Sequence, residues 1–236
     1  MGYYGYGFYY DWTYILVVIG AIICLLAQGL VTSTFNKYTK VRSRTNLTGR
    51  ETAERILRYA GITDVSVVHV NGNLTDHYDP RSKTVNLSDS VYNSTSVAAV
   101  SVAAHECGHV IQHNTGYLPL NFRTALVPAA NIGSYAAWPL IIIGLFINGQ
   151  TSTLLIQLGI ILFSLSVLFQ IVTLPVEINA SRRADHILQE IGILDSEEAR
   201  YTKKVLGAAA LTYVASAAAA ILQLLRLVLL FGRKRD

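Results

Sequence analysis

The chain has 236 residues and a mass of 25.9 kDa; 52% of its residues are hydrophobic and only 14% are charged. A typical soluble domain carries about 25% charged residues, so this composition excludes disorder and argues against a soluble globule. The net charge of +4 and the pI near 9.0 arise without a basic patch interleaved with aromatic residues, so no nucleic-acid partner is expected.

The hydrophobic residues gather in segments that are each close to the ~20 residues that a helix needs to cross a bilayer. We therefore predict a mainly α-helical, polytopic membrane protein with about four membrane helices and a small cytoplasmic α+β portion. The segments are 15–30, 126–147, 154–174 and 205–231.

Residues 1–31 are predicted to form a retained N-terminal anchor helix. Their start is rich in Tyr and Gly and lacks the Lys and Arg of a secretory signal peptide. No basic residue precedes the first apolar segment, whereas four follow it within residues 37–44. Because loops rich in Lys and Arg stay in the cytoplasm, we expect the N-terminus outside and residues 32–125 in the cytoplasm.

The region 32–125 contains legible local patterns. Thr48 and Glu51 form a capping box, which predicts a helix from about 49 to 60. Three β-favouring runs follow and are separated by strong turn signals, so they predict a small antiparallel β-meander. These runs are 65–70, 74–78 and 83–87.

Residues 105–109 read His-Glu-Cys-Gly-His within a stretch of high helical propensity, 96–112. Positions i and i+4 share one face of a helix and lie ~6 Å apart along its axis, so His105 and His109 can bind one Zn²⁺. Glu106 is then placed to take a proton from the water that the metal activates. The alternative is a pair of core histidines, but unpartnered polar groups are costly on such an apolar helix.

A catalytic zinc needs a third protein ligand and one open position. Glu177 is the best candidate, because it opens a predicted cytoplasmic helix in the region 175–204. Residues 126–174 are predicted to form a transmembrane hairpin around the uncharged turn 148–152, which returns Glu177 to the membrane surface near His105. The alternative is a carboxylate that stabilises a helix N-terminus or pairs with Arg.

Three further features bear on this site. Pro175 predicts a break or a restart of the helix. His113 continues the four-residue spacing, but it would lie ~12 Å from His105 along one straight helix, too far to share its metal. Residues 205–236 are predicted to form a C-terminal membrane-associated helix and a basic tail; because basic residues flank it on both sides, its orientation stays open.

These motifs resemble those of the bacterial neutral zinc metallopeptidases of the inner membrane, the YugP-like family. The resemblance covers nearly the whole chain and implies a zinc endopeptidase in the plasma membrane, with one zinc per chain and a cytoplasmic active site. It implies a peptide or membrane-protein substrate, three metal ligands, and Glu106 as the general base. The stretches that carry it are 73–81, 87–92, 105–109 and 175–184.

The arrangement is also similar to the HtpX-type and prenyl-protein endopeptidases, which are gluzincins. In those proteins a Glu-x-x-Ala-Asp motif provides the third zinc ligand, and its Asp orients a ligand histidine. Glu177 and Ala180 match this pattern, but Ser181 stands where those proteins have Asp. Asn179 or Asp185 is therefore expected to supply the outer contact that Ser181 cannot.

Two features are predicted to contact the substrate. The run 84–88 resembles the edge strand on which metallopeptidases lay an extended substrate, although it is equally compatible with an ordinary sheet member. His77 is predicted to stabilise the tetrahedral intermediate as a hydrogen-bond donor, the alternative being a solvated loop histidine. The strand residues concerned are Thr84, Val85, Asn86 and Leu87.

Two rival functions share the histidine motif. An intramembrane protease of the site-two type places the motif in a spanning helix, but the apolar run before His105, 97–104, is too short to span. A non-catalytic scaffold with structural zinc needs a fourth ligand, commonly a cysteine. Cys107 lies ~200° from His105 around the helix, so it points away from the metal. The zinc endopeptidase is the preferred prediction.

Overall fold

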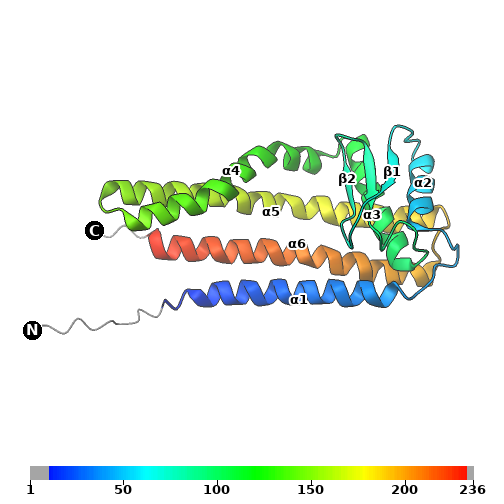
Figure 1. Cartoon of the computed structure of the whole chain (residues 1–236), viewed down its shortest axis with the longest axis horizontal. Coiled ribbons are helices and arrows are strands. Elements are labelled where there is room, and N and C mark those ends of the chain that lie inside the picture. The colour runs from blue at the N-terminus through cyan, green and yellow to red at the C-terminus, as the bar shows by residue number, and fades with distance from the viewer. Residues whose placement is uncertain (1–10, 233–236) are drawn as a thin grey trace, which may run out of the picture.

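The computed structural model describes residues 11–232 (Figure 1). The Tyr- and Gly-rich start, 1–10, and the basic tail, 233–236, lie outside this described part. The elements in chain order are α1 (Tyr14–Tyr38), α2 (Gly49–Tyr59), β1 (Ser66–His69), β2 (His77–Asp79), β3 (Thr84–Leu87), α3 (Val97–Asn114), α4 (Leu118–Phe146), α5 (Gln150–Glu190) and α6 (Ser196–Phe231).

Four helices within residues 11–232 are long and apolar enough to cross a membrane: α1, α4, α5 and α6. The prediction of a mainly helical chain with about four candidate membrane helices is therefore confirmed. The sheet, α2 and α3 form a compact portion at one end of these helices (Figure 1). Helix α1 begins and α6 ends at the opposite end, so these two helix ends lie far from the compact portion.

Helices α4 and α5 form the predicted hairpin and pack closely. A Cβ on Gly159 would lie 2.6 Å from Cγ1 of Ile141, so only glycine permits this approach. Pro128 and Pro139 lie inside α4, and Figure 1 shows α4 bent. Proline removes a helical hydrogen bond and crowds the preceding turn, which accounts for a bend.

Helix α5 runs without interruption through Pro175, so the predicted break is wrong. A proline inside a helix costs ~3 kcal/mol, but packing against α3 holds the following turn. Val176, Ala180 and Ala184 are fully buried, and the Val176 carbonyl accepts a hydrogen bond of 2.8 Å from Nε2 of Gln112. Tertiary contacts therefore override the local signal.

Helix α6 is continuous over the apolar segment whose path was left open by the sequence. Asp195 and Glu198 form a capping box at its N-terminus. Arg226, which interrupts the apolar run, donates to the Asp11 carboxylate at 2.8 Å and lies 4.1 Å from the ring centroid of Tyr14. This charge is thus partnered where α6 ends beside the start of α1.

The three strands form one sheet in the order β1-β3-β2, with β1 parallel and β2 antiparallel to β3. The predicted antiparallel meander is therefore wrong. The β1–β2 connection is held to the chain beyond β3, because Asp76 accepts hydrogen bonds from the amide and hydroxyl of Ser88. Asp89 likewise accepts one from the amide of Gly72. These bonds hold the β1–β2 connection across the end of β3, so that β2 pairs with the edge of β3 opposite β1.

The core of the compact portion lies between the sheet, α2 and α3. Helix α2 spans Gly49–Tyr59 with the predicted capping box of Thr48 and Glu51, so that prediction is confirmed. Its Ile56 is fully buried, as are Val85 and Leu87 of β3. This packing fixes α3 against the sheet on one side, while its opposite face meets α5.

Candidate metal centre

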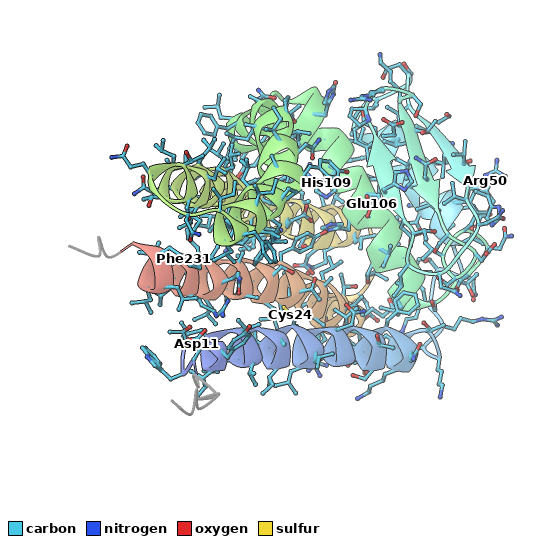
Figure 2. The ribbon with its side chains drawn as sticks, turned by 60° about the vertical axis from the view of Figure 1, so that its left-hand side comes forward. Asp11, Cys24, Arg50, Glu106, His109 and Phe231 are labelled. Atoms are coloured by element: carbon cyan, nitrogen blue, oxygen red, sulfur yellow. The ribbon has the colours of Figure 1, made fainter. Side chains whose placement is uncertain are left out.

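Helix α3 presents His105 and His109 on one face, with their ring centroids 4.8 Å apart. The side chain of Ser96 caps the helix by accepting a hydrogen bond from the amide of Ala99. Small side chains dominate the helix, so neighbouring backbones approach it closely. In Figure 2, Glu106 and His109 lie between the sheet and the long helices.

The closest neighbour of this helix is α5. A Cβ on Gly108 would lie 2.6 Å from the carbonyl oxygen of Ala180, so the glycine within the histidine motif allows α3 and α5 to meet. Glu177 lies one turn before Ala180 on the same helix. The contact at Gly108 therefore brings the Glu177 carboxylate to the two imidazoles.

The three predicted ligands converge. Oε2 of Glu177 lies 3.4 Å from Nε2 of His105 and 3.5 Å from Nε2 of His109, and one ligand atom from each residue lies within 4.8 Å of the others. Two tetrahedral ligands with bonds of ~2.1 Å to zinc lie ~3.4 Å apart. Oε2 of Glu177 is also buried without a hydrogen-bond partner. This donor set fits Zn²⁺.

Neutral side chains orient both histidines. The hydroxyl of Ser181 lies 3.2 Å from Nδ1 of His105. Nδ1 of His109 lies 3.0 Å from Oε1 of Gln112, whose Nε2 donates to Oδ1 of Asn179 at 3.0 Å. Ser181 thus makes the outer contact itself, and Asn179 acts through Gln112. Sequence reasoning missed Gln112, although its position three residues after His109 was a usable signal.

Asp185 makes no such contact, so its predicted role beside the ligands is wrong. Its Oδ2 lies 3.6 Å from Nζ of Lys203 on α6. Asp185 lies two turns beyond Glu177 on α5, which places it past the histidine pair. Its carboxylate joins α5 to α6.

Glu106 is the buried carboxylate next to the cluster, with 7% of its surface exposed. Burial raises the pKa of Glu106, because desolvation disfavours the charged form, while the neighbouring His105 and His109 oppose the rise. A carboxylate with a raised pKa is a better proton acceptor at neutral pH. The side chain is therefore suited to the role of general base.

A cavity of about 230 Å³ opens over the cluster, and we call it the strand-side cavity. It is walled by β2 and by the start of α4. Nδ1 of His77 donates to the carbonyl of Thr75 at 2.8 Å, and the ring of His113 meets Tyr78 edge to face with centroids 6.0 Å apart. The cavity residues outside the metal cluster include Asp76, His77, Tyr78, His113, Arg123 and Tyr213.

Arg123 and Tyr213 were not predicted as site residues. Arg123 precedes the second apolar segment and Tyr213 lies inside the fourth, so both have the sequence context of membrane packing. Only the return of α4 and α6 to the histidine helix places them in the cavity. No local pattern near either residue carried that information.

The predicted substrate strand needs correction. Strand β3 is the central strand, so 84–88 is not a sheet edge. Val85 and Leu87 are fully buried, and Nδ2 of Asn86 donates to the carbonyl oxygen of His77 and to Thr84 within the sheet. The edge strand beside the cavity is β2, which contains His77.

The chain is similar to known proteins over nearly its whole length. A family model described as "Putative neutral zinc metallopeptidase" matches residues 13–232. The chain belongs to this family. It is also 46% identical over 224 residues to the "Putative membrane protease YugP" of Bacillus subtilis (strain 168), covering 94% of this chain and 98% of that protein. No solved structure matches the chain.

Membership of this zinc metallopeptidase family and the four apolar helices support a protease role in a membrane. Two features weigh against the rival functions. Helix α3 is not among the candidate membrane spans of residues 11–232, unlike the motif helix of a site-two protease. The thiol of Cys107 faces the carbonyl of Ala53 at 3.7 Å, and burial raises its pKa, so it offers no fourth ligand.

Proposed function

We propose that this member of the zinc metallopeptidase family is an endopeptidase that hydrolyses peptide bonds with one Zn²⁺ per chain. His105, His109 and Glu177 are the ligands, and Glu106 is the general acid and base. The observation that carries this proposal is the convergence of three ligand atoms beside the buried carboxylate of Glu106, at the base of a cavity.

When bound, zinc supplies a Lewis acid that polarises the scissile carbonyl and lowers the pKa of water toward ~7. Glu106 accepts the proton of the attacking water and delivers it to the leaving amine. Ser181 and Gln112 hold the histidine rings so that both Nε2 atoms face Glu177. His77 donates from Nδ1 to the Thr75 carbonyl, and in its doubly protonated form it would also donate from Nε2 to the developing oxyanion.

The free edge of β2 is proposed to bind the substrate backbone. It borders the strand-side cavity through His77 and Tyr78, and β2 pairs with β3 on one side only. An extended peptide added to this edge would pass over the metal cluster. This replaces β3 as the substrate strand while keeping binding by strand addition.

Metal removal tests the proposed hydrolysis. Purified protein dialysed against a strong chelator is expected to lose cleavage of an unstructured protein such as casein, and to regain it when one equivalent of Zn²⁺ is returned. Mg²⁺ is expected not to restore cleavage, because imidazole ligands suit zinc and not magnesium. Fluorescence of labelled casein measures the rates. Undiminished cleavage by the metal-free protein would contradict the proposal.

We further propose that the site faces the cytoplasm of a bacterial cell and that the N-terminus lies outside the plasma membrane. The support is the charge distribution: four basic residues within 37–44 lie at the compact end, whereas the α4–α5 turn at the opposite end carries no charge. Helices α1 and α6 begin and end, respectively, at that opposite end (Figure 1).

Thiol labelling tests this orientation. In a Cys24→Ala background, Asn148→Cys is expected to react with an impermeant thiol reagent on intact cells. Ser82→Cys is expected to react only after permeabilisation. Both positions are exposed and Cys107 is buried; position 149 is avoided because its backbone has a φ of 86°. Labelling of Ser82→Cys alone on intact cells would reverse the orientation.

A further inference from the structure

A second cavity, of about 270 Å³, lies on the other side of Glu106. Its floor is the metal face of α3, and its walls come from two of the candidate membrane spans, α1 and α6. We call it the membrane-side groove. Its wall residues are Gln28, Val31, Leu206, Ala209, Thr212 and Tyr213.

The two cavities adjoin at the metal centre. Asp76, His105, Glu106 and Tyr213 line both of them. The membrane-side groove and the strand-side cavity therefore border the proposed catalytic carboxylate from two sides. A chain that lies over Glu106 would extend toward β2 in one direction and toward α1 and α6 in the other.

The groove lies at the depth of the membrane surface. Val31 follows Tyr14, the first residue of α1, by 17 positions, which is about 26 Å at 1.5 Å per residue. Tyr213 precedes Phe231, the last residue of α6, by 18 positions, or about 27 Å. The hydrocarbon core of a bilayer is ~30 Å thick, so both walls reach the groove where the helices leave the lipid.

One polar side chain that lines the groove, that of Gln28, suits a peptide ligand. Gln28 is the amide-bearing residue within the otherwise apolar run 15–31 of α1, and it lines the groove. Gln28 lies three positions before Val31 on α1, about one turn further into the lipid, where a polar side chain is costly against lipid tails. Its amide both donates and accepts hydrogen bonds, as a peptide backbone does. Val31, Leu206 and Ala209 supply apolar contacts beside it.

We propose that the membrane-side groove binds the apolar segment that joins the transmembrane helix of a membrane-anchored protein to its water-exposed chain. Glu106 then lies next to the point at which such a chain leaves the bilayer. The substrate class is thus a membrane-anchored protein cleaved close to its anchor. This inference rests on the proposed peptidase function. A lipid tail or a soluble peptide as the occupant is an outcome of the test.

The test compares two defined peptides with the full-length, zinc-loaded protein in lipid vesicles. The first is a Leu-rich span of ~20 residues followed by a polar tail with randomised positions, and the second is the tail alone. The variants are Gln28→Leu and Ala209→Trp. Leu25→Ala is the control, because Leu25 is 72% exposed on α1 and does not line the groove. Bound zinc verifies that each variant is folded.

Wild-type protein is expected to cleave the spanning peptide at least about tenfold faster than the tail, the scale of discrimination of a small apolar pocket. Gln28→Leu and Ala209→Trp are expected to reduce this ratio, and Leu25→Ala to leave it unchanged. Equal wild-type rates on the two peptides would overturn the inference. A ratio that stays at the wild-type value in both groove variants would also overturn it.

Crosslinking tests the groove independently of hydrolysis, so failure of the proposed function remains distinguishable. The Glu106→Gln protein would carry benzoylphenylalanine at position 31 or at the lipid-facing position 25. Stronger crosslinking of the spanning peptide from position 31 than from position 25, with little capture of the tail, supports the inference. Equal yields from both positions, or crosslinks to lipid alone at position 31, would overturn it.

Discussion

Glu106→Gln is expected to retain one zinc per chain and to hydrolyse peptides ~10²–10⁴-fold more slowly, the usual contribution of a general base. The amide has the shape of the carboxylate but cannot accept the proton of the attacking water. The three ligand side chains are unchanged, so metal affinity has no reason to fall. Bound zinc and casein turnover, measured on the same preparation, separate these two properties.

Glu54→Gln is the matched control for this variant. Glu54 pairs with Arg50 at 2.7 Å on the surface of α2, far along the chain from the metal centre, and exposed pairs of this kind contribute little to stability. Its turnover should equal that of the wild type. Turnover at the wild-type rate in Glu106→Gln would remove Glu106 from the chemistry. In cells, membrane proteomics of the same variant should show uncut substrates accumulating.

The features that could be predicted from the sequence are those that depend on neighbouring residues. A capping box requires residues three positions apart, and the histidine pair requires four, so Thr48 with Glu51 and His105 with His109 are legible locally. The four membrane helices follow from composition over ~20 residues. Glu177 could be predicted as a ligand for another reason: a hairpin with a short uncharged turn brings its two ends to the same membrane surface.

The features that could not be predicted depend on contacts between distant residues. The strand order is set by Asp76 with Ser88 and by Asp89 with Gly72, which are 12 and 17 positions apart. A turn signal at Asn71-Gly72 is equally compatible with a hairpin and with this crossing. Arg123 and Tyr213 likewise reach the site only through helix packing. Local patterns do not encode such pairings, because many arrangements satisfy them equally well.

The outer contacts of the ligands distinguish this chain from the pattern of the HtpX-type gluzincins. A carboxylate on Nδ1 raises the basicity of a ligand histidine. Here a hydroxyl, that of Ser181, takes the place of that carboxylate beside Nδ1 of His105, and the amide of Gln112 contacts His109. The His105 imidazole should therefore donate less charge to the metal than a carboxylate-bound histidine would, leaving a stronger Lewis acid. The neutral side chains still orient the ligand rings, since the Gln112 amide is itself held by a hydrogen bond to the Val176 carbonyl on α5.

Removing the third ligand should have the largest effect on metal binding. Glu177→Ala leaves two histidines that cannot complete a site with three protein ligands, so zinc should be lost on dialysis against a weak chelator. His113→Ala is the matched control. His113 lies on α3 with His105 and His109, but its ring contacts Tyr78 and it does not belong to the ligand cluster. It should retain close to one equivalent.

Gln112→Leu is expected to bind zinc with an affinity between those of His113→Ala and Glu177→Ala. It keeps all three ligands but removes the contact to Nδ1 of His109, and losing such an outer contact typically weakens metal binding ~10–100-fold. The expected order of zinc affinity is wild type and His113→Ala, then Gln112→Leu, then Glu177→Ala, measured by metal analysis across a chelator series. Full occupancy in Glu177→Ala would exclude Glu177 as a ligand. The close approach of α5 at Gly108 would then have no role in metal binding.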